Sequence, residues 1–292
     1  MAPAVSTRIQ LAGELPTLRA LGVEEAEELF RPGGNPDQRG AVLEGDPGGR
    51  STVRFPLPGT PDAGGRLNGR PGEVGTGWVV LSRWCRASLF ELVRSRFTAP
   101  RSASLAEREW NLYCHLLGHG VGVPRPLAVG ARGQGLFSRD SFLVTRELGG
   151  FEPLKEWAGR ERDPEHRRRA AVALGLLLAN VVRAGVLLPR LSVEDLGVKP
   201  ESRDDVGGSC DAHLPSVPGR LKIRHLPGVA ILGVRGGLVR KTLGPKEVHA
   251  MLSHLLEDAR SKGLVDPGEA RRIAALTVRG GSDRRRLWQA LR

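Results

Sequence analysis

Aromatic residues and cysteines are both scarce in this chain of 292 residues, and each shortage narrows what it can be. Phe, Trp and Tyr together make up 4% of the residues, so the core has to be built mostly from Leu, Val and Ala. The three cysteines, Cys85, Cys114 and Cys210, are widely spaced and form no CxxC pair. This excludes a disulfide framework and favours free thiols in a reducing compartment. No four-ligand zinc pattern of cysteines and histidines is present, so a zinc site is not predicted either.

Long apolar runs are also missing. The longest, Ala170–Asn180, is far shorter than the roughly 20 residues that span a bilayer. Residues 1–8 lack the apolar segment of a secretory signal. We therefore expect a cytoplasmic protein, with attachment to the periphery of the inner membrane as a second expectation.

The positive charge bears on possible partners. The formal net charge is +12 and the sequence pI is about 10.8, which suggests nucleic acid as one ligand. The basic residues are spread along the chain, however, and no helix-turn-helix or aromatic-basic RNA motif is present. Nucleic-acid binding is therefore the least favoured hypothesis. A phosphorylated glycolipid, an anionic membrane surface, a partner protein and an ordinary solvated Arg-rich surface remain as alternatives.

The order of the elements predicts an α+β fold with two lobes. Strand-like segments come first and helical segments follow, with the change near residue 149. We expect an N-terminal extension over residues 1–37, loosely attached, and a β-rich N-lobe over residues 38–148. Residues 58–77, rich in Gly and Pro, are expected to form a flexible insertion in that lobe. A helical C-lobe is expected over residues 149–292.

Periodicity gives the individual elements. In the longest helical pattern Leu174, Leu178 and Val181 share one face, and Gly185 ends it. The expected strands are residues 41–43, 51–57, 78–81, 126–129, 142–145, 221–223 and 229–232. The expected helices are residues 104–117, 153–158, 164–184, 246–262, 267–278 and 283–291.

Three segments carry a family resemblance. They are Ser104–Trp110, with the order Ser-Leu-Ala-Glu-Arg-Glu-Trp, then Gly122–Pro126, with two prolines, and Ser141–Leu148, with Leu-Val-Thr-Arg-Glu-Leu at its end. In this order and spacing they resemble the small lobe of the lipopolysaccharide kinases of the Kdo/WaaP type, a bacterial branch of the protein-kinase-like fold. The resemblance implies a protein-kinase-like fold with ATP and Mg²⁺ as cofactors. It places Glu109 at the helix glutamate and the backbone of Glu147 and Leu148 against the adenine.

Phosphoryl transfer also needs a cation that holds the nucleotide phosphates and pairs with the helix glutamate. By the resemblance this is a lysine on the third strand, and here Ser82 stands at its position with Arg83 next to it. Neighbouring residues on a strand point to opposite faces. Arg83 can therefore replace the lysine only through a register slip or a bulge.

The carboxylates that the resemblance implies are replaced as well. Leu188 stands at the catalytic-loop histidine and Arg190 at the catalytic aspartate. A guanidinium cannot accept a proton near neutral pH, so Arg190 cannot be the base. Five residues on, Asp195 occupies the position of a metal-binding Asn or His, where it can either bind Mg²⁺ or cap the next turn. Gly233 stands where the family carries its metal-binding aspartate, and glycine offers no ligand.

These replacements lead to three functional hypotheses. The leading one is a pseudokinase, which keeps the fold for binding or scaffolding without transferring a phosphoryl group. The second is an active ATP-dependent phosphotransferase on a sugar or glycolipid hydroxyl. It would use Arg83 for the phosphates, and Asp195 with Asp204, Asp205 or Asp211 for Mg²⁺ and the base. The third is a basic nucleic-acid-binding protein, whose binding would weaken steeply with salt.

Overall fold

The computed structural model divides the chain into two compact units. Unit 1 comprises residues 1–150 and 234–240, and unit 2 comprises residues 151–233 and 241–292. The structure describes residues 6–11, 29–30, 41–45, 50–56, 78–85, 104–134, 137–200 and 226–278. The expected insertion, the expected strand at 221–223 and the expected helix at 283–291 lie outside these described residues.

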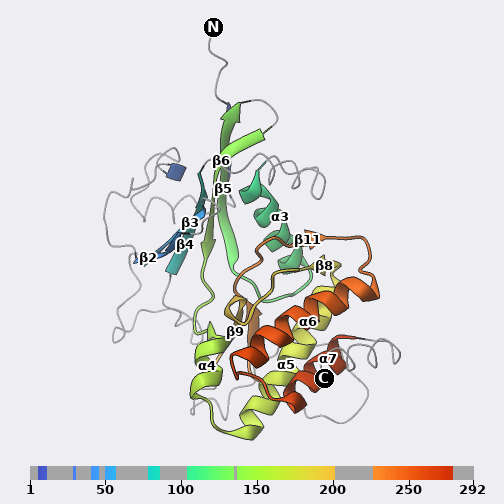
Figure 1. Cartoon of the computed structure of the whole chain (residues 1–292). Coiled ribbons are helices and arrows are strands. Elements are labelled where there is room, and N and C mark those ends of the chain that lie inside the picture. The colour runs from blue at the N-terminus through green and yellow to red at the C-terminus, as the bar shows by residue number, and fades with distance from the viewer. Residues whose placement is uncertain are drawn as a thin grey trace. The chain divides into compact units, whose positions relative to one another are not determined.

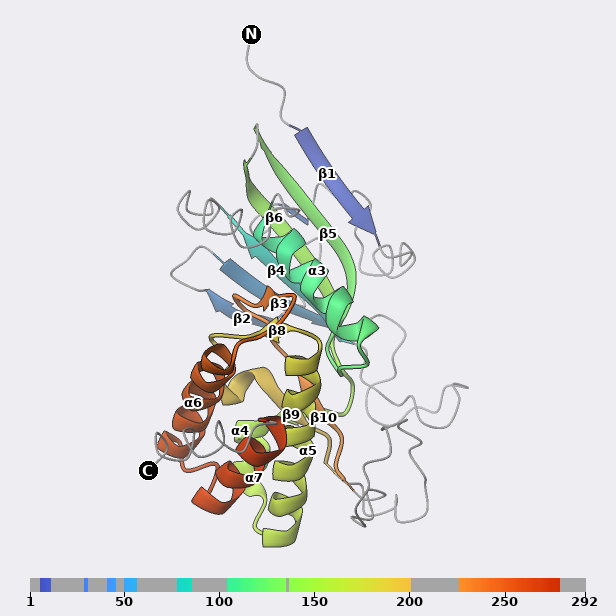
Figure 2. The ribbon, with the colours of Figure 1, turned by 90° about the vertical axis from the view of Figure 1, so that its right-hand side faces the viewer.

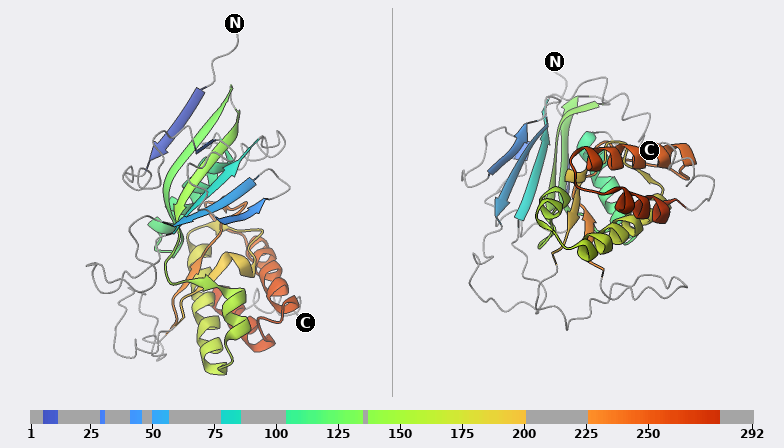
Figure 3. Two further views of the ribbon diagram at one scale, coloured as in Figure 1. Left: turned by 90° about the vertical axis from the view of Figure 1, so that its left-hand side faces the viewer. Right: turned by 60° about the horizontal axis from the view of Figure 1, so that its bottom comes forward.

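Unit 1 is built on an antiparallel sheet of six strands in the order β1-β5-β6-β4-β3-β2 (Figures 1 and 2). The strands are β1 (Ser6–Leu11), β2 (Ala41–Gly45), β3 (Arg50–Pro56), β4 (Trp78–Trp84), β5 (Arg125–Gln134) and β6 (Phe137–Arg146), and β11 (Leu238–Val239) belongs to the same unit. The sheet has the twist usual for neighbouring strands (Figure 3). Most strands are longer than the apolar segments from which they were expected, because the backbone hydrogen bonds between strands continue into the flanking polar residues.

The N-terminal part of the chain is attached to this sheet, in contrast to the loosely attached extension that we expected. Residues 6–11 form β1, which pairs along its whole length with β5 at the edge of the sheet (Figure 2). Farther along, Leu29 and Phe30 are buried at 5% and 4% exposure. A six-residue edge strand with polar neighbours leaves little hydrophobic signal in the sequence, which explains the difference.

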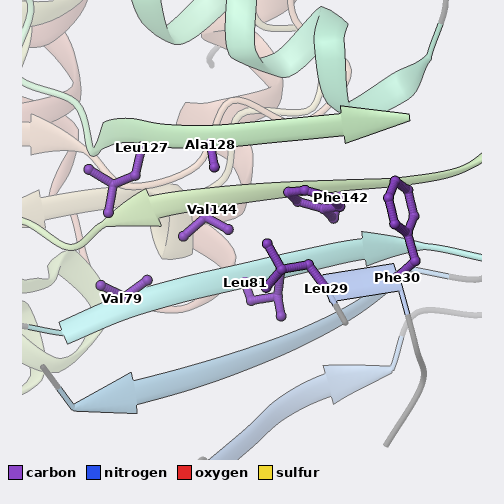
Figure 4. Close-up of a cluster of buried hydrophobic side chains, with 8 residues drawn as sticks. All are labelled: Leu29, Phe30, Val79, Leu81, Leu127, Ala128, Phe142 and Val144. Carbon is purple, nitrogen blue, oxygen red and sulfur yellow. The ribbon is translucent and has the colours of Figure 1, made fainter. Parts of the chain in front are cut away.

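The two faces of the sheet have different roles because side chains alternate along each strand. Val79 and Leu81 of β4 point to one face, where a cluster of buried apolar side chains forms (Figure 4). The cluster comprises Leu29, Phe30, Val79, Leu81, Leu127, Ala128, Phe142 and Val144. The rings of Phe30 and Phe142 meet edge to face at 4.8 Å between centroids. Ser82 of β4 points to the opposite face.

Helix α3 (Leu105–Gly118) packs on the sheet, mainly against β5 and β6 (Figure 2). It starts at Ser104, whose hydroxyl accepts a hydrogen bond of 3.1 Å from the Glu107 N–H. It ends before Gly120, which has the positive φ of 70° that favours glycine. The side chains it buries are Ala106, Glu109, Trp110, Leu112, Tyr113 and Leu116. One of these is a carboxylate, and it lies in the candidate site.

Unit 2 is mostly helical. Its helices are α4 (Leu154–Arg160), α5 (Pro164–Arg183), α6 (Pro245–Ser261) and α7 (Pro267–Thr277), with a short helical turn η2 (Val193–Asp195). Its strands are β7 (Glu152–Pro153), β8 (Val186–Leu187), β9 (Leu196–Val198) and β10 (Val229–Ile231), of which β10, β9 and β7 pair antiparallel in that order. Within the described ranges, no helix combines the length and apolarity that crossing a membrane requires.

Close packing joins α5 to α7, which lie side by side (Figures 2 and 3). Gly175 of α5 makes this possible, since a Cβ there would lie 2.9 Å from the Leu276 Cβ. The hydroxyl of Thr277 donates to the Gly175 carbonyl at 3.3 Å and to the Ile273 carbonyl at 2.8 Å. Unit 2 therefore has a tightly packed helical core.

Candidate functional site

The Ser82 face of the sheet carries a cation, but it comes from the neighbouring strand. Arg50 of β3 donates through Nη2 to the Ser82 hydroxyl at 3.0 Å. Through Nη1 it forms an ion pair of 3.3 Å with Oε1 of Glu109 on α3. Arg50 thus forms the ion pair with the helix glutamate, Glu109, that the resemblance implies for a lysine at position 82.

This arginine is enclosed. Its guanidinium lies over the Trp84 ring, 4.8 Å from the ring centroid, and 14% of the side chain is exposed. Glu109 is buried at 8% exposure. Two buried atoms, Arg50 Nε and Glu109 Oε2, have no hydrogen-bond partner among the described residues. Leaving a buried polar atom without a hydrogen bond costs about 1–3 kcal/mol of stability. The two atoms can still form hydrogen bonds, and the pair is therefore not saturated.

Arg83, the expected replacement for the lysine, points away from Glu109. It lies on the face of the apolar cluster, buried at 6% exposure, and its Nε donates to the Leu29 carbonyl at 2.8 Å. Burial lowers the pKa of Arg83 from its usual value, while the charge of Cys85 acts in the opposite direction. β4 pairs with β3 and β6 without a register shift, so neither route by which Arg83 could reach the site is present. The cation beside Glu109 is therefore Arg50.

The expected adenine contacts lie after β6. The Glu147 N–H donates to the Trp78 carbonyl at 2.9 Å, so this group is already used within the sheet. The Glu147 carboxylate accepts from Arg54 Nε at 3.0 Å and from its Nη2. Arg54 lies over the Trp78 ring at 4.3 Å. The next residue, Leu148, is half-buried. This contact set fixes the Glu147 side chain on the sheet face that also carries Arg50.

In unit 2 the loop after β8 holds the expected catalytic positions. Leu188 is buried at 1% exposure, and its N–H donates to the Met251 sulfur at 3.5 Å. The turn closes with a hydrogen bond of 3.1 Å from the Leu191 N–H to the Leu188 carbonyl. Arg190 lies on this turn and is exposed. The position of the catalytic aspartate is thus a surface arginine.

Asp195 and Gly233 lie in contact. Asp195 Oδ2 accepts from the Ser192 N–H at 3.0 Å and from its hydroxyl at 2.8 Å, which caps the helical turn η2. The Leu232 N–H donates to the Asp195 carbonyl at 2.6 Å, so the loop after β10 is held against this turn. A Cβ added at Gly233 would overlap Asp195 Oδ1. The Asp195 carboxylate therefore fills the space in which a side chain at position 233 would start.

Two neighbouring carboxylates, those of Glu194 and Asp258, form ion pairs with lysines. Glu194 pairs with Lys155 at 3.5 Å and with Lys262 at 3.4 Å, and Asp258 pairs with Lys262 at 2.9 Å. Among the residues that the structure describes, no group of three His, Cys, Asp or Glu side chains could hold a metal ion. The displaced ligands considered from the sequence, Asp204, Asp205 and Asp211, lie outside the described residues.

Sequence reasoning missed Arg50, and only the observed strand register identifies it. The expected strand began at residue 51, one residue too late to include it. Thr52 lies directly opposite Ser82 in the observed register, and side chains two residues apart share a face. An arginine two residues before Thr52 therefore had to lie on the Ser82 face.

Comparison with known proteins relates the chain to one family of kinases. Residues 62–201 match the model of the lipopolysaccharide kinase (Kdo/WaaP) family. A solved structure of WaaP in complex with acyl carrier protein is 17% identical, with a TM-score of 0.59, and the match covers 98% of this chain and 100% of WaaP. No curated protein matches the chain.

Two further solved structures resemble the fold more weakly. A double mutant of the Mycobacterium tuberculosis PknI kinase domain is 11% identical with a TM-score of 0.41, covering 87% of this chain and 94% of its own. A glucosamine kinase is 13% identical with a TM-score of 0.32, covering 91% of this chain and 72% of its own. The family match and the WaaP structure are the informative ones. Residues 62–201 are thus similar to the lipopolysaccharide kinase (Kdo/WaaP) family, and the chain has a protein-kinase-like α+β fold.

Proposed function

We propose that this protein is a pseudokinase of the Kdo/WaaP family, a binding protein that does not transfer a phosphoryl group. The observation that carries the proposal is the contact between Asp195 and Gly233. The one described carboxylate in this region at an expected metal position caps a turn through Ser192, and it fills the space of the missing side chain at position 233.

The chemistry of the reaction supports this proposal. Transfer to a hydroxyl requires a carboxylate that orients the acceptor and accepts its proton, and carboxylates that hold Mg²⁺. Arg190 stands at the first position and keeps its proton at neutral pH. Gly233 stands at the second and provides no oxygen ligand from a side chain. Two separate requirements of the reaction therefore lack their groups.

A binding function needs a partner, and we propose a protein partner. WaaP was solved with acyl carrier protein, so a carrier protein of this class is the first partner to test. The net charge of +12 favours an acidic partner or an anionic glycolipid surface over a basic one. The same charge supports attachment at the periphery of the membrane.

A transfer assay tests the absence of catalysis. Purified protein is incubated with γ-labelled ATP, Mg²⁺ or Mn²⁺ and a lipopolysaccharide core acceptor, and an active member of the family serves as the positive control. We expect no acceptor labelling above background. The assay is repeated with Asp195→Asn, which removes the carboxylate charge but keeps the shape of the side chain. Metal-dependent labelling by the wild type that disappears in Asp195→Asn would contradict the proposal.

A further inference from the structure

We propose that His115 and His119, at the C-terminal end of α3, chelate one divalent transition-metal ion of the class to which Ni²⁺ and Zn²⁺ belong. The inference goes beyond the proposed function, because neither histidine stands at a position that the kinase resemblance assigns. It concerns unit 1 alone. The protein supplies two ligands here, so the site differs from the four-ligand zinc patterns that the sequence lacks.

The first step of the argument is the distance between the two imidazole rings. Residues four positions apart lie on the same face of an α-helix, one turn apart. The ring centroids of His115 and His119 are 4.3 Å apart, and the ring planes are inclined at 43°. Two nitrogens that bind one ion at about 2.0–2.1 Å each must lie about 3–3.4 Å from one another. Rings at the observed separation meet this requirement after small rotations about their side-chain bonds.

The second step concerns the nitrogen of His119 that is available to a metal. Its Nδ1 lies 2.8 Å from the His115 carbonyl oxygen. A carbonyl oxygen only accepts hydrogen bonds, so Nδ1 carries the proton, and the lone pair of the neutral ring is on Nε2. Histidines that bind metals usually have this arrangement, in which one ring nitrogen donates to a carbonyl or carboxylate and the other binds the ion. The helix therefore holds His119 in the tautomer that a metal ligand needs.

The surroundings of the pair favour a cation that arrives from solvent. His119 is exposed and His115 is half-buried. His115 lies in the last turn of α3 and His119 directly after it, where the helix dipole carries partial negative charge. Imidazole nitrogens suit Ni²⁺ and Zn²⁺, whereas Mg²⁺ prefers oxygen ligands. No third side chain of the described residues joins the pair in a metal-binding group, so water or a second molecule completes the coordination.

A purely structural role for His119 is the alternative. Its side chain satisfies a carbonyl group at the end of α3, as groups that cap a helix C-terminus do. The substitution His119→Asn separates the two roles. The asparagine amide can donate to the same carbonyl, but it has no second ring nitrogen that could bind a metal. If the histidine only caps the helix, this substitution leaves metal binding unchanged.

The test is a calorimetric titration of the full-length protein with Ni²⁺ and, separately, with Zn²⁺, in a buffer that does not bind metals. We expect saturable binding of one ion at this site. His119→Asn and His115→Gln should each weaken that binding at least about tenfold, because the remaining imidazole then binds the ion without a linked partner. Mg²⁺ should show no binding that depends on either histidine. In EDTA, His119→Asn should melt at the temperature of the wild type, which shows that the cap is kept.

His249→Ala is the matched control. His249 is also a partly exposed histidine on a helix, and its Nδ1 lies 3.5 Å from the Ser253 hydroxyl, but no histidine stands three or four positions away. Its removal should change the affinity by less than about twofold. The inference is overturned if the wild type binds neither ion, if folded His119→Asn binds as tightly as the wild type, or if His249→Ala weakens binding equally. None of these results affects the transfer assay, so either proposal can fail alone.

Discussion

Among the residues that the structure describes, each unit contains one well-enclosed arginine–glutamate pair, and the two pairs form different numbers of hydrogen bonds. In unit 2, Arg167 meets Glu269 with two parallel contacts, Nε to Oε1 at 3.1 Å and Nη2 to Oε2 at 3.2 Å. Arg167 also donates to the Ala158 and Leu264 carbonyls at 3.3 Å and 2.9 Å. In unit 1, Arg50 meets Glu109 with one contact of 3.3 Å.

The two pairs differ in how many of their hydrogen-bonding atoms are used. Arg167 connects α5 to the residues around α4 and α7, and the Glu269 carboxylate also accepts from the Asp266 N–H at 2.8 Å. The hydrogen bond with Glu269 raises the pKa of Arg167, although burial opposes this. Arg50 Nε and Glu109 Oε2 have no partner among the described residues. The Arg167 pair is therefore nearly saturated with hydrogen bonds, whereas the Arg50 pair keeps two buried polar atoms unsatisfied.

The largest effect is expected from breaking the saturated pair. Arg167→Met leaves the Glu269 carboxylate buried at 5% exposure without its counter-charge. We expect a loss of about 3–5 kcal/mol in the free energy of unfolding, measured by urea denaturation. The neighbouring Arg168, which is 59% exposed and lies 3.8 Å from Glu165, provides the control. Arg168→Met should cost less than about 0.5 kcal/mol, and equal losses would contradict the comparison.

A smaller loss is expected when the unsaturated pair is broken. Arg50→Met leaves Glu109 unpaired, and we expect a cost of about 1–3 kcal/mol, because two hydrogen bonds are lost instead of four. Replacing both residues by methionine should recover most of this loss, since an apolar pair needs no hydrogen bonds. Urea denaturation of the single and double variants measures both values. A double variant less stable than Arg50→Met would show that the pair is structural.

A third prediction tests how rigidly α5 and α7 hold the saturated pair. Gly175→Ala places a methyl group 2.9 Å from Leu276 and 3.2 Å from the Ile273 Cα, so the helices must separate. We expect a destabilisation of about 1–3 kcal/mol in thermal or urea unfolding. Gly159→Ala in α4 is the control, because nothing lies within 4 Å of its added Cβ, and it should stabilise by up to about 1 kcal/mol. The same sign for both variants would disprove the close packing.

The smallest effect concerns the partly exposed charges around η2. Burial opposes ionisation of Asp258, but hydrogen bonds from Lys262 and the Val193 N–H outweigh it and lower the pKa of the carboxyl. A lowered folded pKa contributes stability above the unfolded pKa, and this contribution is lost as the pH falls through the folded pKa. Asp258→Asn should therefore cost about 0.5–1 kcal/mol at pH 7, and this cost should shrink as the pH falls through the lowered folded pKa of Asp258. Urea unfolding at several pH values measures this, and a constant difference would contradict it.

The sequence predicted those parts of the fold that rest on local signals. α5 was expected over residues 164–184 and spans Pro164–Arg183, because Asp163, Pro164 and Gly185 supply a cap, a first-turn proline and a positive-φ stop. The α+β class followed from the order of strand and helix patterns. β1 was missed because pairing with β5, and not its own residues, makes it a strand.

The candidate site was predictable only in part for the same reason. The resemblance led to Glu109 and to Ser82, but the cation between them depends on which β3 residue lies beside β4. The alternation of side chains along β4 predicts that Arg83 and Ser82 point to opposite faces of the sheet. It cannot identify Arg50, because that requires the register between β3 and β4. The sequence also could not show that the Asp195 carboxylate lies against Gly233, because the two residues are 38 positions apart in the chain (233 − 195).

The contact between Asp195 and Gly233 also bears on how this protein can evolve. Reversion of position 233 to aspartate would require the Asp195 carboxylate to move, which would break its cap on Ser192 at a cost of about 1 kcal/mol. Arg190 would still be unable to accept a proton from an acceptor hydroxyl. Under the proposed pseudokinase function, this single substitution would therefore lower the stability without providing transfer activity. Selection would meet a loss before any gain. Under the proposed pseudokinase function, the lineage can therefore explore new partners more easily than it can gain catalysis.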